Sequence, residues 1–270
     1  MRRNKSVKLY IIIVLVLIIG FMAAGVKIFA DRISENSEAG EAAVNIKEIQ
    51  KIDFRPDPVK AALGKYDGNA SLTTPEFQKA PDGYFEDALF IGDSRTVGLK
   101  EYGNISGADF FATEGMSVYG IYKENVNIEN FGAISFKTLI QSKKYGKIYI
   151  MLGINELGYR LSDTAARFEK LVNTIKKYQP DAIIYIEANL HVSSKLSKSD
   201  KIFNNSRIDR YNNMLAQIAD NRTVFYIDAN EMFDDREGGL GEEYTSDSIH
   251  IMGKYYSDWG SWIAERVIVK

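Results

Sequence analysis

The sequence predicts an α/β domain in which a parallel β-sheet carries helices on both faces. Short apolar runs rich in β-branched and aromatic residues recur from about residue 82 onward, and such runs are typical of strands buried on both faces. Segments with the apolar spacing of amphipathic helices separate them, and strands that alternate with helices usually pair in parallel. The five predicted strands are Ala88–Ile91, Asp109–Ala112, Lys147–Leu152, Ala182–Glu187 and Thr223–Asp228.

Three helices are predicted, the first two from the 3.6-residue period of their apolar side chains. The apolar face of the first consists of Ala165, Phe168, Leu171, Val172 and Ile175. Ser162 and Asp163 precede this face and are candidate N-caps. The apolar face of the second consists of Ile208, Tyr211, Leu215 and Ile218, and a last helix is predicted from Met252 to about Val267.

The first residues of the chain have the pattern of a membrane anchor. An uncharged run of 18 residues extends from Leu9 to Val26, and as a helix it would span about 27 Å, close to the ~30 Å hydrocarbon core of a bilayer. The cations that precede it are Arg2, Arg3, Lys5 and Lys8. A basic flank predicts that residues 1–8 stay in the cytoplasm and that the rest of the chain lies outside.

Two alternatives to an uncleaved anchor remain open. A cleaved signal peptide would use the small residues Ala23-Ala24-Gly25 and would release a secreted protein. The run could also be a buried core helix. We expect a single-pass anchor over residues 9–26, with the remainder of the chain outside the cell membrane.

Residues 27–81 are predicted to form an extracytoplasmic stalk. Acidic residues dominate its opening stretch, where Arg32 is the single cation among Asp31, Glu35, Glu38 and Glu41. Four of the chain's five prolines, at positions 56, 58, 75 and 81, interrupt helices and sheet ladders. This composition is typical of a tether, so residues 82–270 are expected to form the folded domain.

Composition excludes several classes of chemistry. The 34 basic and 36 acidic residues give a formal net charge of −2, which leaves no basic excess for binding nucleic acid. The absence of cysteine removes disulfides, thiolate nucleophiles and cysteine metal sites. The two histidines, His191 and His250, do not form a zinc motif. An enzyme that works with hydroxyl, carboxylate and imidazole groups remains, or a non-enzymatic binding protein.

Ser94 directly follows the first predicted strand, in the stretch Gly92-Asp93-Ser94-Arg95-Thr96. A serine on a strand-to-helix turn presents its hydroxyl, and the free amides of the helix N-terminus face a developing negative charge. The stretch is not the G-x-S-x-G elbow of the α/β-hydrolases, because Thr96 takes the place of the last glycine. Alone, it is equally typical of a turn with a helix cap.

A candidate base lies near the other end of the chain. Imidazole has a pKa near ~6.5 and can remove the proton of a serine hydroxyl at neutral pH. The base needs an acceptor that fixes its tautomer, and Asp247 precedes His250 by three residues, within reach of the ring. The alternative is a loop with a helix cap.

Two residues could stabilise an oxyanion. Asn155 follows the third predicted strand in Gly153-Ile154-Asn155-Glu156, and its side-chain amide could donate a hydrogen bond there. Gly115 follows the second predicted strand, and a glycine lets its backbone N–H approach a substrate closely. An Asx turn and a plain turn are the alternatives.

Taken in order, Ser94, Gly115, Asn155 and His250 resemble the quartet that names the SGNH/GDSL hydrolases. The blocks that carry this resemblance are FIGDSRTVGL, FFATEGMSV, MLGINELG and DSIH, within about residues 85–268. Two positions depart from the family pattern: Glu156 stands where an Asp is usual, and Arg95 stands where a leucine is frequent. Neither departure removes a catalytic group.

The resemblance implies a three-layer α/β/α fold and an ester hydrolase that needs no metal or organic cofactor. It assigns Ser94 as nucleophile, His250 as base and Asp247 as the acid that orients it. The oxyanion hole would consist of the Ser94 and Gly115 amides and the Asn155 side chain. His191, in the loop Asn189–Lys195, is expected to be a surface or packing residue.

The expected substrate is an ester, with O-acetylated carbohydrate outside the membrane as the favoured class. We expect neither nucleic acid nor an obligate protein partner. An O-acyltransferase or a lipase using the same site, and a catalytically idle glycan-binding domain, remain alternatives.

Overall fold

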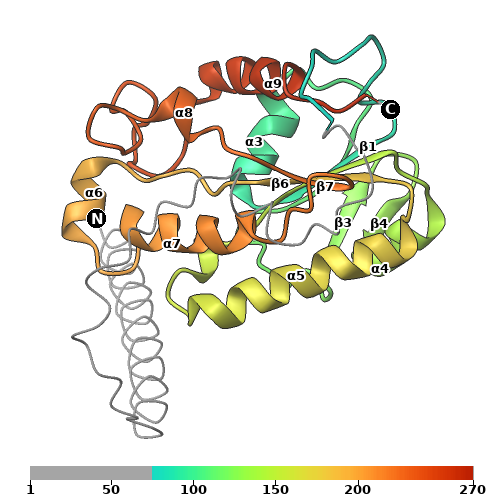
Figure 1. The fold of residues 1–270 in the computed structure, drawn as a ribbon, viewed down its shortest axis with the longest axis horizontal. Helices are drawn as coiled ribbons and strands as arrows, with labels where there is room; N and C mark the ends of the chain where they lie inside the picture. The colour runs from blue at the N-terminus through green and yellow to red at the C-terminus, as the bar shows by residue number, and fades with distance from the viewer. Residues whose placement is uncertain (1–74, 270) are drawn as a thin grey trace, which may run out of the picture. The chain divides into compact units, whose positions relative to one another are not determined.

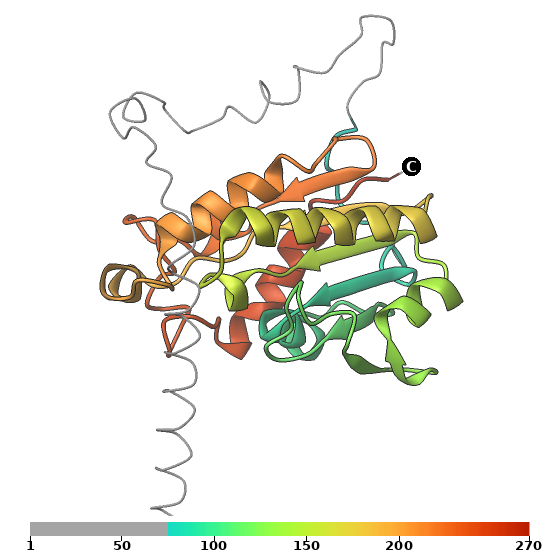
Figure 2. The same cartoon turned by 90° about the horizontal axis from the view of Figure 1, so that it is seen from below.

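A computed structural model of the chain describes residues 75–269 and confirms the predicted α/β fold with a parallel central sheet. The sheet has the order β2-β1-β5-β6-β7, and every neighbouring pair is parallel. Its strands are β1 (Ala88–Gly92), β2 (Asp109–Ala112), β5 (Lys147–Met151), β6 (Ile183–Glu187) and β7 (Val224–Ile227). Figure 2 shows the strand arrows pointing the same way. All five predicted strands are therefore present, with ends shifted by at most one residue.

The predicted tail and anchor, residues 1–26, and residues 27–74 of the stalk lie outside the described residues. Within residues 75–269, no helix has both the length and the apolar character needed to cross a bilayer.

Helices cover both faces of the sheet, as Figure 1 shows. One face packs against α4 (Phe136–Ser142), α5 (Leu161–Tyr178) and α7 (Asn205–Ala216). The other packs against α3 (Ser94–Tyr102), α8 (Asn230–Phe233) and α9 (Tyr256–Ala264). The short α6 (Ser194–Ser199) buries no residue. The remaining elements are the 3₁₀ turns η2 (Ile154–Glu156) and η3 (Gly253–Tyr255), and the antiparallel hairpin β3 (Asn125–Ile128) and β4 (Gly132–Ser135).

Each strand feeds two apolar cores because its side chains alternate between the faces. In β1, Leu89 and Ile91 enter the core under α4, α5 and α7, whereas Ala88 and Phe90 enter the opposite core. A row of aromatic rings crosses the sheet on this second side. Phe90 stacks on Phe110 and Tyr149 with ring centroids 5.0 and 4.4 Å apart, and Tyr149 stacks on Tyr185 at 4.3 Å.

The strand order reverses its direction at β1, and this predicts where a site lies at the carboxyl ends of the strands. The chain runs from β1 to β2 on one side of β1 and then returns past β1 to form β5 on its other side. In open parallel sheets, ligands bind beyond the carboxyl ends of the strands at such a reversal. Ser94 follows β1 and Asn155 follows β5, so both lie at these carboxyl ends.

Several boundaries differ from the sequence prediction. The helix α5 begins at Leu161, with Arg160 at its N-cap position, so Ser162 and Asp163 lie inside the first turn and do not cap it. The second helix, α7, ends at Ala216, so Ile218 lies beyond it. The predicted last helix over 252–267 is a 3₁₀ turn followed by α9, which ends at Ala264.

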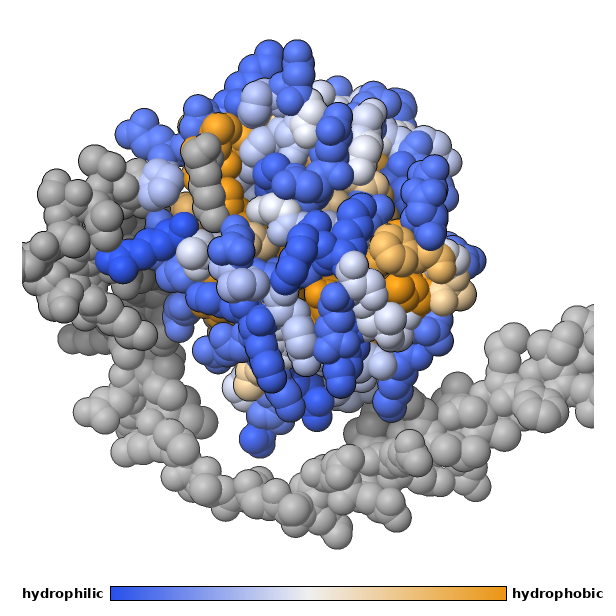
Figure 3. Space-filling model, turned by 90° about the vertical axis from the view of Figure 1, so that its right-hand side faces the viewer, coloured by the Kyte–Doolittle hydropathy of each residue, from blue (hydrophilic) through white to orange (hydrophobic). Residues whose placement is uncertain are grey.

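The end of the predicted stalk contacts the folded domain. The Gln78 amide donates to the Val267 carbonyl at 2.9 Å and the Ala80 amide donates to the Ala264 carbonyl at 2.6 Å. The Phe77 ring lies edge-on to Phe225, with centroids 6.0 Å apart. The contacts of the domain therefore extend to residues 77–80. The face of the molecule in Figure 3 is mostly hydrophilic, with small hydrophobic areas separated by hydrophilic side chains.

Candidate active site

Ser94 lies in the first turn of α3, immediately after β1. The Asp93 carboxylate caps this helix and accepts a hydrogen bond from the Arg95 amide at 3.0 Å. Gly92 makes the turn possible, because a Cβ there would lie 1.8 Å from Thr96 Oγ1 and 2.9 Å from the Met151 carbonyl oxygen. The turn therefore leaves the Ser94 hydroxyl at the helix N-terminus, where the residue is half-buried.

A chain of hydrogen bonds links Ser94 to the acid and base proposed from the sequence. Ser94 Oγ lies 3.0 Å from His250 Nε2, and His250 Nδ1 lies 2.7 Å from Asp247 Oδ2. The other oxygen of Asp247 accepts from the amides of Ile249 and His250 at 2.9 and 2.7 Å. Partial burial raises the pKa of Asp247, but the hydrogen bonds from His250 and from the Ile249 amide outweigh it and lower the pKa to about 2.

This arrangement fixes the tautomer of the base. Asp247 is ionised at neutral pH and accepts the Nδ1 proton, so Nε2 faces Ser94 as an acceptor. In this geometry the imidazole can activate the serine, and the carboxylate orients the imidazole.

The two oxyanion candidates lie in the same cavity as Ser94 and His250. This cavity has a volume of about 570 Å³, and Gly115 and Asn155 both line it. Gly115 has φ +71, a conformation that favours glycine. Asn155 Nδ2 donates to the Met116 carbonyl at 3.1 Å, which ties its side chain to the loop that carries Gly115. The structure thus brings the whole predicted quartet together.

One face of α3 forms a wall of the cavity that the sequence analysis missed. The helix residues that line it are Ser94, Val97, Gly98, Glu101 and Tyr102, which follow the helical period from the nucleophile. Continuing the 3.6-residue spacing from Ser94 could have found them. Glu114 joins them on the rim, and the described residues that line the cavity include neither lysine nor arginine.

Arg95 supports the acid–base loop from inside the domain. Its side chain is fully buried, and Nη2 donates to the Ile249 carbonyl at 3.4 Å. Burial lowers the pKa of the guanidinium, and the negative charges of Asp93 and Asp247 counteract this effect. The residue that departs from the family pattern therefore contacts the backbone between Asp247 and His250.

Glu156 has a similar role beneath the oxyanion residues. It is 1% exposed, and Oε1 accepts a hydrogen bond from the Val118 amide at 2.7 Å. Burial raises its pKa to about 7. The longer side chain thus spans from η2 to the loop after β2, and it joins the segment of Asn155 to the loop that carries Gly115.

His191 does not line the cavity. Its ring nitrogens lie 2.8 Å from Asp234 Oδ2 and 2.9 Å from Asp209 Oδ1, so it packs between two carboxylates. No group of three or more His, Cys, Asp or Glu residues within residues 75–269 is arranged to hold a metal ion.

Comparisons with known proteins agree with this geometry. The model of the GDSL-like Lipase/Acylhydrolase family matches residues 90–256. No curated protein matches the chain.

Solved structures share the fold at low sequence identity. A Streptococcus pneumonia protein assigned as a platelet activating factor is 19% identical, with a TM-score of 0.51 over 66% of this chain and 81% of that one. A lipolytic protein assigned to the G-D-S-L family of Desulfitobacterium hafniense is 14% identical, with a TM-score of 0.51 over 66% and 97%. A Bacteroides fragilis protein assigned as an acylhydrolase is 16% identical, with a TM-score of 0.50 over 70% and 88%.

Proposed function

The chain belongs to the GDSL-like lipase/acylhydrolase family, and from this premise we propose that it is a serine esterase with Ser94 as its nucleophile. The observation that carries the proposal is the hydrogen-bonded series Ser94–His250–Asp247 opening into a cavity lined by Gly115 and Asn155. A hydroxyl, a base that can take its proton and donors for an oxyanion are the groups that acyl transfer requires.

The acylation step uses each of these groups. Ser94 Oγ attacks the ester carbonyl carbon while its proton passes to His250 Nε2, and Asp247 stabilises the imidazolium. The negative charge on the former carbonyl oxygen is held by the amides of Ser94 and Gly115 and by the Asn155 side chain. The tetrahedral intermediate then collapses, the ester C–O bond breaks, and the leaving alkoxide takes the proton from His250.

Deacylation repeats the sequence with water. His250 removes a proton from water, the hydroxide attacks the acyl carbon, and Ser94 leaves with the proton returned by His250. An acceptor alcohol in place of water would make the same site a transferase.

We propose short acyl groups on carbohydrate as the substrate. Val97 and Ile251 are the aliphatic side chains among the described residues that line the cavity, which is little apolar surface for a long acyl chain that gains about 0.8 kcal/mol per buried methylene. Tyr102 is 53% exposed on the rim and offers a ring on which a sugar can stack. Glu101 and Glu114 can accept hydrogen bonds from hydroxyl groups, and their charge disfavours anionic glycans.

A series of p-nitrophenyl esters tests this proposal. We expect kcat/KM to be highest for the acetyl ester and to fall by about 10-fold or more for the octanoyl ester, because the cavity does not bury the longer chain. A rise with chain length would favour a lipase and contradict the short-acyl proposal. Absence of turnover for every ester would favour a binding domain and contradict the enzyme itself.

We propose that the domain acts outside the cell membrane, anchored by residues 9–26. The support comes from the sequence: a basic flank, and then an uncharged run long enough to span the bilayer. This location would bring the esterase into contact with acylated glycans of the cell surface.

Protease treatment of intact, wall-stripped cells tests the orientation. We expect cleavage to release a fragment of about the size of the folded domain, because the linker before it would be accessible from outside. A cytoplasmic protein should stay intact in the same sample as a control. Complete protection of the chain, with cleavage only after lysis, would contradict the orientation, and a pool in the medium that lacks residues 1–26 would indicate cleavage of the anchor.

A further inference from the structure

The segment Asn189–Ser193, which follows β6, is held by backbone hydrogen bonds at Asn189, His191, Val192 and Ser193. We call it the support segment. The carboxamides that hold its backbone are those of Asn212 at Asn189, Asn230 at Asn189 and His191, and Asn205 at Val192. These bonds pair most of the backbone groups of a stretch that is neither helix nor strand and so hold it in one conformation.

Each end of the support segment makes a hydrogen bond to a segment that carries a residue of the candidate active site. At one end, Asn189 Nδ2 donates to the Leu152 carbonyl at 3.2 Å, three residues before Asn155. At the other end, the Ser193 amide donates to the Ser248 carbonyl at 2.9 Å. Ser248 lies between Asp247 and His250, so the second contact bears on the acid and base directly.

Ser248 has a backbone conformation that needs such support. Its φ is +73, in the left-handed region that residues with a Cβ rarely adopt. Strained conformations persist only where neighbouring groups enforce them. The Ser248 amide donates to Thr245 Oγ1 at 3.0 Å, and its carbonyl accepts from the Ser193 amide. Loss of the second bond would let this residue relax and move the His250 ring away from Ser94.

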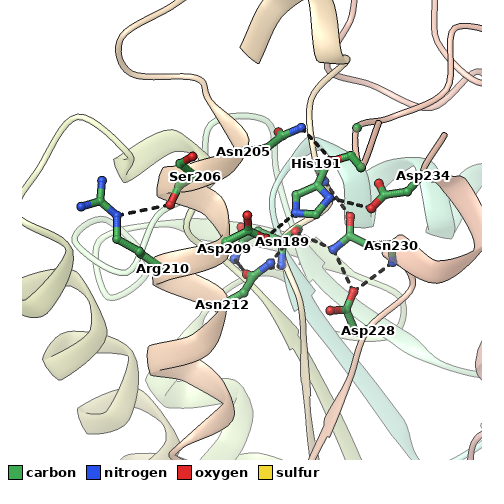
Figure 4. A network of polar contacts seen from close by, with 12 residues as sticks. Asn189, His191, Asn205, Ser206, Asp209, Arg210, Asn212, Asp228, Asn230 and Asp234 are labelled. Carbon is green, nitrogen blue, oxygen red and sulfur yellow. Dashed lines mark hydrogen bonds and ion pairs between the residues drawn. The ribbon is translucent and has the colours of Figure 1, made fainter. Parts of the chain in front are cut away.

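The His191 ring links the support segment to α7 and to the residue that follows α8. Figure 4 shows its ring pointing at Asp234 on one side and Asp209 on the other. Asp209 lies on α7 and Asp234 follows α8. Of the other charged residues drawn there, Asp228 bonds to Asn230 and Arg210 bonds to the Ser206 carbonyl.

The ring is suited to carry a positive charge. Burial lowers the pKa of His191, but the two aspartates outweigh it and raise the pKa to about 9. An imidazolium has a donor for each carboxylate, whereas a neutral ring has only one. The double ion pair is therefore complete below about pH 9 and is lost as the pH rises through that value.

We propose that His191 is a positioning residue for catalysis: its ion pairs with Asp209 and Asp234 fix the support segment, whose Ser193 amide holds Ser248 and thereby the acid–base loop. The part of this inference that concerns rate rests on the proposed esterase function. The part that concerns the geometry of His250 stands without it.

Two substitutions at Ser193 isolate the contact with Ser248. Ser193 has φ −57, a value that proline adopts. Its hydroxyl accepts from the Leu196 amide at 3.2 Å, and Ser193→Ala and Ser193→Pro both lose this cap. Only the proline variant also loses the N–H that Ser248 accepts. His191→Gln removes the positive charge that pairs with Asp209 and Asp234. Glu237→Gln breaks the exposed pair with Lys198 and is the control.

The measurements are made on the full chain with p-nitrophenyl acetate. We expect Ser193→Pro and His191→Gln to lower kcat about 10-fold with KM nearly unchanged, because misplacement of a catalytic group affects the chemical step. Ser193→Ala and Glu237→Gln should stay within about 2-fold of wild type, since the first removes only a cap and the second only an exposed pair. The kcat of wild type should also decline as the pH rises through about 9, and His191→Gln should lack this decline.

A spectroscopic readout separates this inference from the proposed function. The His250 Nδ1 proton, bonded to Asp247, should give a low-field NMR signal, and His191→Gln identifies it because the chain has two histidines. We expect the signal to shift or broaden in Ser193→Pro and to match wild type in Ser193→Ala. Wild-type signals and kcat in folded Ser193→Pro and His191→Gln would overturn the inference. If the signal changes in Ser193→Pro but the wild-type chain turns over no ester, the positioning role stands and only the esterase function is refuted.

Discussion

Replacing Ser94 by alanine should reduce ester turnover by roughly 10⁴-fold or more, because the nucleophile is lost and only the oxyanion donors remain. The domain should keep its stability, because only one hydroxyl is removed. The side chain lies at the rim of the cavity, and its hydroxyl bonds only to His250 among the contacts that the structure gives it. The measurement is kcat/KM on p-nitrophenyl acetate together with the midpoint of thermal unfolding. Ser142→Ala, in which an exposed serine bonds to its own helix, is the matched control and should behave as wild type.

Two outcomes would contradict the role of Ser94. Equal turnover by Ser94→Ala and wild type would show that another group is the nucleophile. A large drop in the unfolding midpoint, matched by the drop in activity, would show that the serine is structural.

Replacing His250 by alanine should cost nearly as much, because nucleophile and base depend on each other. Ser94 would remain in place but would keep its proton at neutral pH. The further readout is chemical rescue: added imidazole should restore part of the turnover of His250→Ala and none of that of Ser94→Ala. Lys254→Ala, an exposed residue of the turn η3 four positions after His250, is the control and should keep its activity.

Full activity of His250→Ala would contradict the role of this residue. In that case the 3.0 Å contact between His250 Nε2 and Ser94 Oγ would have no catalytic role, and a different base would have to act on Ser94.

The parallel sheet could be predicted from the sequence because its strands are buried on both faces. In β5 and β6, for example, consecutive residues are apolar, and short runs of this kind are typical of strands covered by helices on both sides. The hairpin β3–β4 could not be predicted in the same way. In β3 only Val126 and Ile128 are buried and in β4 no residue is fully buried, so neither strand has a continuous apolar run. The helix α6 buries nothing and has no period to detect.

The residues that the structure brings together at the candidate site could be predicted because each block is local in sequence. Ser94 and Asn155 follow apolar strands, and Asp247 and His250 are three residues apart. The supporting residues could not, because their partners are distant along the chain. Arg95 contacts Ile249, 154 residues away, and His191 contacts Asp234, 43 residues away. Only the folded chain brings these groups together and shows what they hold.

Labelling with a fluorophosphonate tests the central claim most directly, because the reagent reacts with a serine hydroxyl only when a base activates it. The full chain is treated with the reagent, and the modified residue is found by peptide mass analysis. We expect one label, on Ser94, with no label on Ser94→Ala and slow labelling of His250→Ala. A label on another residue, or equal labelling of wild type and Ser94→Ala, would contradict the assignment of Ser94 as the nucleophile.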